Sequence, residues 1–114
     1  MFYWNCFFKL IWTYFNLIHF YAVDVQNVFV NEGGTVVLQC TCQGDFQWVR
    51  GVKKPKTGII ENGKAKDYVA DHIRIPSMKC HDLEVSNITQ TDEQHYKCLC
   101  ENGTYVYKLN ISGK

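Results

Sequence analysis

The sequence predicts an all-β domain, and three of its features lead to that prediction. Apolar and polar residues alternate in short runs, Gly, Asn and Asp separate the runs, and no segment after residue 22 has the period of a helix. The 114 residues are enough for one core and too few for two domains. Six cysteines are many for a reducing compartment, so we expect the domain to fold in an oxidising one.

Residues 1–22 resemble a secretory signal peptide. They are rich in aromatic residues and contain no acidic one, and the apolar stretch from Leu10 to Ile18 follows the basic Lys9. We expect cleavage near Ala22, which leaves residues 23–114 as the folded domain; an uncleaved membrane anchor and a folded first strand are the alternatives. Without Lys9 the 12 basic residues become 11, equal to the 11 acidic ones, so the domain has no general attraction for nucleic acid.

Four strands are predicted in the first half of the domain, each followed by turn residues. They span residues 25–30, 35–42, 46–50 and 57–61. Because strand side chains alternate, we expect one face of each strand to point inward. The inward residues are Val36, Leu38, Cys40 and Cys42 on the second strand and Phe46 and Trp48 on the third. Asn62-Gly63, a strong hairpin signal, closes the fourth strand.

Four more strands are predicted in the second half. A short one around Ile73 and Ile75 stops at Pro76, because proline cannot donate a hydrogen bond to a sheet. The others span residues 82–88, 95–100 and 104–111. Their inward residues are Leu83, Val85, Tyr96, Cys98, Cys100, Tyr105, Tyr107, Leu109 and Ile111. Residues 64–69 are only weakly patterned, which leaves their structure open.

Five of these residues form an arrangement found in a known family. Cys40 lies on the second strand, Trp48 lies on the third, and Tyr96 comes two residues before Cys98. With Asp92 ahead of Tyr96, the arrangement resembles an immunoglobulin domain of the variable or intermediate type, over residues 25–112. The resemblance implies an immunoglobulin-like β-sandwich of two antiparallel sheets with Greek-key connections.

The resemblance also implies roles for single residues. It implies that Cys40 and Cys98 bridge the two sheets, that Trp48 packs on the bridge, and that the Tyr96 hydroxyl bonds to the backbone of the corner before its strand. Arg74 stands where variable-type domains pair an arginine with the aspartate of this corner, here Asp92. An ordinary exposed ion pair is the alternative for Arg74.

Two further cysteines lie two residues beyond the bridging pair. In an immunoglobulin sandwich the strands that carry the pair run toward the same end, so Cys42 faces Cys100 if Cys40 faces Cys98. We therefore predict a second, stacked disulfide. The competing interpretation, a zinc site of four thiolates, needs Cys-x-x-Cys spacing and a reducing compartment.

Cys80 is left over once these two bridges are assigned. Its parity is opposite to that of Leu83 and Val85, so its side chain is expected to point outward. An odd outward cysteine in a secreted chain suggests a disulfide to another chain. The alternatives are an intrachain bridge to Cys42 or Cys100, and a capped or free thiol.

Three N-glycosylation sequons add support for export. They begin at Asn87, Asn102 and Asn110, in a turn or at positions opposite in parity to their apolar neighbours, so we expect all three to be exposed. A glycan on Asn102 shields the tip of the last hairpin. Binding is then expected at a sheet face.

One basic patch stands out in the neutral domain. It comprises Lys53, Lys54, Lys56, Lys64 and Lys66. One interpretation is recognition of an acidic partner or a sulfated glycan. The other is a solvated sheet edge that discourages aggregation.

No residue pattern points to catalysis. His72, His81 and His95 have no suggestive spacing with carboxylates, and the sequence contains no nucleophile elbow, phosphate-binding glycine loop or zinc-protease motif. We therefore predict neither an enzyme nor a cofactor nor a metal site.

The function predicted is an extracellular binding module of the immune-receptor or cell-adhesion type. The resemblance implies that the front sheet of the sandwich engages a protein partner. The outward residues expected to contact it are Gln47, Val49, Lys53, Lys54, Ile59, Leu99, Val106 and Lys108. The alternative is a soluble decoy or structural subunit, covalently paired through Cys80 and without signalling of its own. No second hydrophobic segment follows the leader, so we expect a secreted chain or a truncated ectodomain.

Overall fold

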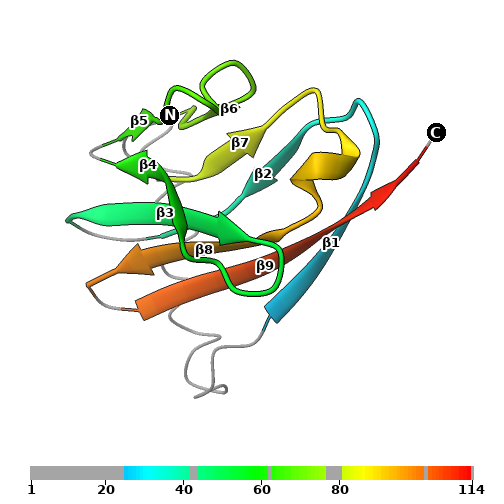
Figure 1. The fold of residues 1–114 in the computed structure, drawn as a ribbon. Coiled ribbons are helices and arrows are strands. Elements are labelled where there is room, and N and C mark those ends of the chain that lie inside the picture. The colour runs from blue at the N-terminus through cyan, green and yellow to red at the C-terminus, as the bar shows by residue number, and fades with distance from the viewer. Residues whose placement is uncertain (1–24, 42–43, 62, 77–80, 102, 114) are drawn as a thin grey trace, which may run out of the picture.

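The computed structural model describes residues 25–41, 44–61, 63–76, 81–101 and 103–113. Within these ranges the chain forms nine strands in two sheets and one short 3-10 helix (Figure 1). The predicted leader lies outside the described residues. In the part of the chain that is described, no helix has the length and apolar character needed to cross a membrane.

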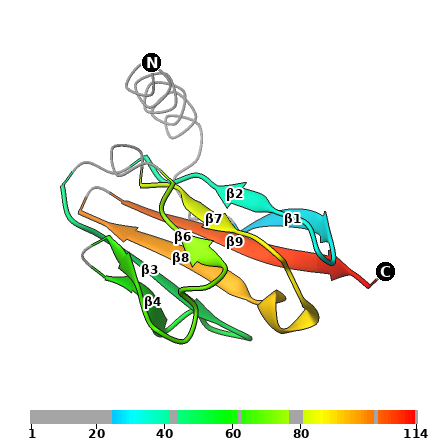
Figure 2. The same cartoon turned by 90° about the horizontal axis from the view of Figure 1, so that it is seen from above.

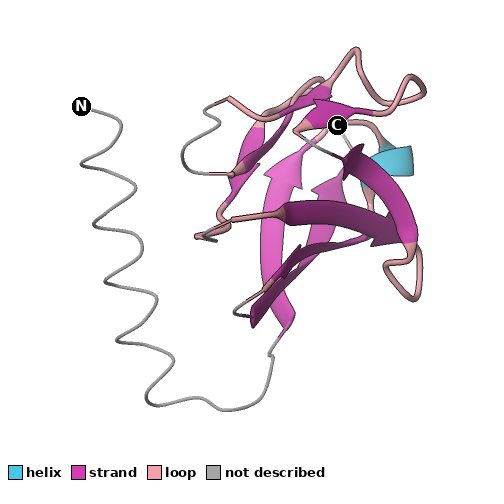
Figure 3. Cartoon of the chain, turned by 90° about the vertical axis from the view of Figure 1, so that its left-hand side faces the viewer, coloured by secondary structure: helices cyan, strands magenta, loops and turns pink. Residues whose placement is uncertain are grey.

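The larger sheet has six strands in the order β1-β9-β8-β3-β4-β5. Their bounds are β1 Val25–Asn31, β3 Phe46–Gly51, β4 Thr57–Glu61, β5 Lys64–Ala65, β8 His95–Cys100 and β9 Gly103–Ser112. The smaller sheet has the order β2-β7-β6, with β2 Val36–Leu38, β6 Ile73–Arg74 and β7 Leu83–Val85. The sheets form the two layers of a sandwich (Figure 2), and the helix η1, Gln90–Asp92, lies in the connection from β7 to β8 (Figure 3).

The predicted all-β sandwich is confirmed, and each of the eight predicted strands is present in whole or in part. The weakly patterned segment contributes a ninth, β5, which pairs with β4. One pair departs from the antiparallel arrangement, because β1 runs parallel to β9. After β1 the chain crosses to the other sheet through a turn in which Gly33 has a φ of 87°, a backbone conformation that favours glycine.

Strand β2 is shorter than the predicted range, because side chains take the place of strand partners after Leu38. The Gln39 carbonyl accepts a hydrogen bond from the Tyr107 hydroxyl at 2.5 Å, and the Cys40 amide donates to the Asp82 carboxylate at 2.9 Å. Cys40 nevertheless keeps its predicted inward direction and is fully buried.

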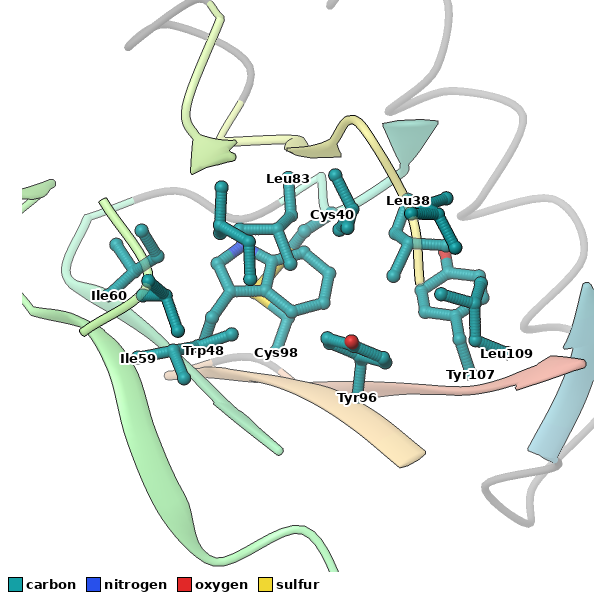
Figure 4. Packing of buried hydrophobic residues seen from close by; sticks show 14 residues of the cluster. Leu38, Cys40, Trp48, Ile59, Ile60, Leu83, Tyr96, Cys98, Tyr107 and Leu109 are labelled. Atoms are coloured by element: carbon teal, nitrogen blue, oxygen red, sulfur yellow. A yellow bond between two sulfur atoms is a disulfide. The ribbon is translucent and has the colours of Figure 1, made fainter. Parts of the chain in front are cut away.

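A hydrophobic core fills the space between the sheets (Figure 4). Its buried members are Leu38, Cys40, Trp48, Ile59, Ile60, Val69, Ile73, Leu83, Val85, Ile88, Tyr96, Cys98, Tyr107 and Leu109. Most are the residues that alternation assigned to the inward face. Removing their apolar surface from water is the main force that holds the sheets together.

A β-bulge places one predicted contact residue in this core. The register of β3 against β4 shifts so that Trp48 pairs with Ile60 and Val49 pairs with Gly58, which leaves Ile59 as the extra residue. Alternation does not hold across a bulge. Ile59 and Ile60 are both 0% exposed. The prediction that Ile59 is an outward contact residue is therefore wrong.

Candidate functional site

The front face is the side of the larger sheet that points away from the core. Its residues have a parity opposite to that of the inward residues on the same strands, which are Val28 on β1, Trp48 on β3, Tyr96 on β8 and Tyr107 on β9. They are Val25, Asn27 and Phe29 on β1, Val106 and Lys108 on β9, His95, Lys97 and Leu99 on β8, and Gln47 and Val49 on β3. This is the surface on which the sequence predicts partner binding.

The strand register arranges the front face in rows. One row runs across four strands from Val25 through Val106 and Lys97 to Val49. On β8 and β3 the next row contains Leu99 beside Gln47. Aliphatic side chains therefore gather around Lys97 in the middle of the sheet.

Exposure varies widely over the front face. Phe29 is 78% exposed and Val25 is 47% exposed, whereas Val49 is only 5% exposed. Leu99, Val106, Gln47 and Lys108 are half-buried.

The prediction that Val49 is exposed is wrong. It lies on a central strand between Gly58 and Lys97. The Gln47 side chain leans over Gly58, with its amide nitrogen 3.2 Å from the place that a Cβ on Gly58 would take. Side chains from neighbouring positions on the same face therefore crowd around Val49.

The turn from β3 to β4, residues 52–56, is called the lysine turn from here on. It carries Lys53, Lys54 and Lys56, and all three side chains are exposed. The sequence predicted this exposure for Lys53 and Lys54. A Cβ on Gly51 would lie 1.9 Å from the carbonyl oxygen of Lys54, so only glycine fits there. The His95 Nδ1 lies 3.1 Å from the Val52 carbonyl oxygen, and this contact joins the turn to β8.

The Cys40–Cys98 disulfide is present, as the resemblance implies. Trp48 is fully buried beside it (Figure 4), and the indole nitrogen of Trp48 donates to the His81 carbonyl oxygen at 3.0 Å. The disulfide and the buried Trp48, together called the disulfide centre, join the two layers.

Cys100 is also disulfide-bonded, and its Sγ lies 3.4 Å from the Sγ of Cys40. Cys42 lies outside the described residues, so a bridge between Cys42 and Cys100 stays a prediction. The sulfurs of Cys40, Cys98 and Cys100 lie within 4.8 Å of one another. Because Cys40 and Cys98 are joined to each other, neither offers a thiolate to a metal ion.

A charged cluster lies near the C-terminal end of β3. It comprises Arg50, His72, Asp92 and Tyr96 and is called the corner cluster. The carboxylate of Asp92 is 1% exposed and lies 3.1 Å from Nη1 of Arg50 and 3.0 Å from Nε2 of His72. The Tyr96 hydroxyl donates to the Asp92 carbonyl oxygen at 2.9 Å, as the resemblance implies, and accepts from Arg50 Nη1 at 3.1 Å.

The predicted pair of Arg74 with Asp92 is wrong. Arg74 is 68% exposed and pairs with Glu84, which lies opposite it on β7. Arg50 takes the place next to Asp92 because it has the same inward parity as Trp48 and lies opposite Tyr96 on β8.

Burial and neighbouring charges shift the pKa values of Asp92 and His72 in opposite directions. Burial alone raises the pKa of Asp92, but the Thr89 amide at 2.9 Å, His72 and Arg50 outweigh it and hold that pKa below its ordinary value. Burial alone lowers the pKa of His72, but the carboxylates of Asp71 and Asp92 outweigh it and raise that pKa. Burial raises the pKa of Tyr96 to about 12, so its hydroxyl stays protonated. The cluster is a structural charge network.

His81 and His95 also have structural contacts. The ring of His81 stacks on Phe46 with centroids 4.0 Å apart, and burial lowers the pKa of His81, which favours the neutral form of the ring. His95 holds the lysine turn. These contacts stabilise turns and strand ends.

Comparison with known proteins shows similarity of structure only. No protein-family model matches the sequence, and no curated protein sequence matches it. The second immunoglobulin domain of the mouse polymeric immunoglobulin receptor matches with a TM-score of 0.65 at 12% identity, over 80% of this chain and 99% of that one. The CD2-binding domain of CD58 matches with a TM-score of 0.61 at 20% identity, over 77% of this chain and 54% of that one. An extracellular domain of the sodium channel beta4 subunit matches with a TM-score of 0.58 at 15% identity, over 79% and 87%.

The chain has an immunoglobulin fold. Its larger sheet carries β4 and β5 beyond β3, and variable-type immunoglobulin domains add two strands at this edge. The bridging cysteines, the buried Trp48 and the Tyr96 corner all occupy the places that the fold assigns to them.

The predicted modification sites of this immunoglobulin domain differ in their surroundings. Asn87 is exposed, at a position with a φ of 49°. Asn110 is half-buried, and its Nδ2 donates to the Lys108 carbonyl and the Asn27 side chain, both at 3.2 Å. Asn102 and Cys80 lie outside the described residues. Glycosylation and interchain pairing stay predictions.

Two features of the domain were missed by the sequence analysis. Phe29 lies between the inward Val28 and Val30, so strand parity could have placed it on the front face. Arg50 shares the inward parity of Trp48, and an inward charge calls for a charged partner nearby.

Proposed function

We propose that this chain is an extracellular binding module whose front face engages a protein partner, in immune recognition or cell adhesion. The observation that carries the proposal is the apolar surface on the outer side of the larger sheet. Phe29 is 78% exposed and Val25 is 47% exposed, next to the half-buried Val106. Exposed aromatic and aliphatic side chains gathered on one face are typical of protein-binding surfaces.

The structural neighbours support binding as the function of such a fold. The matched domain of CD58 is described as CD2-binding, and the matched beta4 domains are described as parallel homodimers with a role in cell-cell adhesion. The CD58 domain thus binds a different protein, whereas the beta4 domain pairs with a second copy of itself.

A cell-binding titration tests the proposal. The full chain is secreted from cultured animal cells with a C-terminal biotin tag, made tetrameric on streptavidin, and titrated onto a panel of cell lines. Val25→Asp places a charge on the front face and is expected to weaken saturable binding about tenfold. Val37→Asp is the matched control, because Val37 is 46% exposed but lies on β2 of the smaller sheet.

The control variant is expected to bind like the unmodified chain. An equal loss in both variants contradicts the front face as the binding surface, and the absence of saturable binding on every cell line contradicts the function itself.

Peptide mapping under non-reducing conditions tests the extracellular part of the proposal. We expect the secreted protein to begin near residue 23 and to yield peptides that link the segment of Cys40 and Cys42 to that of Cys98 and Cys100. A disulfide-linked dimer through Cys80 on the same gel supports the alternative, a covalently paired subunit. Retention inside cells with reduced cysteines contradicts both.

A further inference from the structure

The structure points to the chemistry of the partner, an inference that depends on the proposed function. We propose that the front face binds an acidic protein surface, and that the lysine turn together with Lys97 makes the electrostatic contact. The apolar residues of the front face then meet the partner beside these lysines.

The lysine turn is held in place beside the front face. Its tight path depends on Gly51, where any Cβ meets the Lys54 carbonyl oxygen at 1.9 Å. The contact between His95 Nδ1 and the Val52 carbonyl at 3.1 Å joins the turn to a strand of the front face. The charges of Lys53 and Lys54 are therefore carried by a constrained turn next to the sheet.

The basic charge at this place is not neutralised within the described part of the domain. Among the described residues, Lys53, Lys54, Lys56 and Lys97 have no ion pair, whereas Glu61 pairs with Lys66 and Glu93 lies 3.9 Å from Lys108. The domain as a whole has equal numbers of acidic and basic residues once Lys9 is set aside. The positive potential is therefore a local feature that attracts an acidic surface.

A second copy of the chain is a poorer fit to the front face. A face-to-face dimer centred on Lys97, in the middle of the front face, brings the Lys97 side chains of the two copies toward one another. Like charges at about 4 Å repel by about 1 kcal/mol in water and by more in a partly dry interface. Charge complementarity thus favours a different, acidic protein.

A sulfated glycan also fits the apolar part of the surface poorly. Val52 is 69% exposed at the lysine turn. Val25 and Phe29 are exposed on the front face. A sulfated polysaccharide has no aliphatic or aromatic side chains with which to cover them. A protein with acidic residues around an apolar patch covers both kinds of surface.

The test uses the cell-binding titration with two matched pairs of substitutions. Lys53→Gln with Lys54→Gln removes two charges from the lysine turn, and Lys64→Gln with Arg74→Gln removes two exposed charges from β5 and β6. We expect the first pair to weaken binding about 5- to 10-fold at low salt and to reduce the salt dependence, and the second to change binding less than about twofold. Poly-L-glutamate is expected to compete, and protease treatment of the cells, but not heparinase, is expected to remove binding.

The outcomes separate this inference from the proposed function. If Val25→Asp weakens binding while the variant with Lys53→Gln and Lys54→Gln binds normally, the proposal of an acidic partner is wrong. The proposal that the front face binds the partner is then still supported. Loss of binding after heparinase assigns the lysines to a sulfated glycan and overturns the inference. Concentration-dependent dimers in solution that Val25→Asp abolishes identify a second copy as the occupant and also overturn it. If no cell line binds the unmodified chain, both proposals fail.

Discussion

The disulfide centre and the corner cluster both lie between the two sheets, but different forces stabilise them. At the centre, Cys40 and Cys98 are joined covalently and the buried Trp48 packs beside them. At the corner, the buried Asp92 depends on hydrogen bonds and charges from Arg50 and His72. Apolar packing tolerates the loss of a neighbour at a graded cost, whereas a buried charge that loses its partner is strongly destabilising. The comparison predicts four different responses to mutation.

Removal of the disulfide is expected to have the largest effect. Cys40→Ala with Cys98→Ala removes a bridge across 58 residues of chain, and we expect the free energy of unfolding to fall by about 3 to 5 kcal/mol. Urea unfolding and the secreted yield measure the loss, with the exposed Val37→Ala as a control within about 0.5 kcal/mol. A loss below about 1 kcal/mol would mean that the Cys40–Cys98 bridge contributes little to holding the sheets together.

Breaking the charge pair of the corner is expected to come second. Arg50→Met leaves the buried Asp92 carboxylate with His72 and the Thr89 amide but without its arginine, and we expect a loss of about 2 to 3 kcal/mol in urea unfolding. Arg74→Met is the matched control, because it removes an arginine from an exposed pair with Glu84, which contributes less than about 1 kcal/mol. Equal losses in the two variants would show that Asp92 does not need Arg50.

The same two regions differ in how well the sequence predicts them. At the centre, strand alternation and the resemblance to immunoglobulin domains placed Cys40, Trp48 and Cys98 correctly. Each of these positions depends only on the face of its own strand, and alternation determines that face.

At the corner and on the front face, contacts between different strands determine where a side chain points and which partner it has. Arg74 lies next to Glu84 on a neighbouring strand, and this ion pair competes with the one predicted from the family. Ile59 turns inward because of a bulge, a shift of register between two strands that neither strand shows alone. The outward direction of Leu99, Val106 and Lys108 was predictable from parity, but the burial of Val49 depends on the neighbouring strands.

The Tyr96 hydroxyl is expected to contribute less than the charge pair. Tyr96→Phe keeps the buried ring and removes hydrogen bonds to the Asp92 carbonyl and to Arg50, so we expect a loss of about 1 to 2 kcal/mol in urea unfolding. Tyr68→Phe is the matched control, because the Tyr68 hydroxyl donates to the Gly58 carbonyl on the exposed surface. If both variants lose the same amount, burial does not strengthen the bonds of the corner.

His72 is expected to have the smallest effect, and the size of this effect depends on pH in a defined direction. Its two ring nitrogens lie 3.1 Å from Asp71 and 3.0 Å from Asp92, and these carboxylates raise the pKa of His72 against the effect of burial. The charged ring therefore stabilises the fold at pH values below the ordinary pKa of about 6.5, and this contribution disappears as the pH rises through the raised pKa. We expect the stability lost in His72→Gln to be less than about 1 kcal/mol and to be larger at about pH 5 than at about pH 9 in urea unfolding. A loss of the same size at both pH values would mean that the charge of His72 contributes nothing to the stability of the corner.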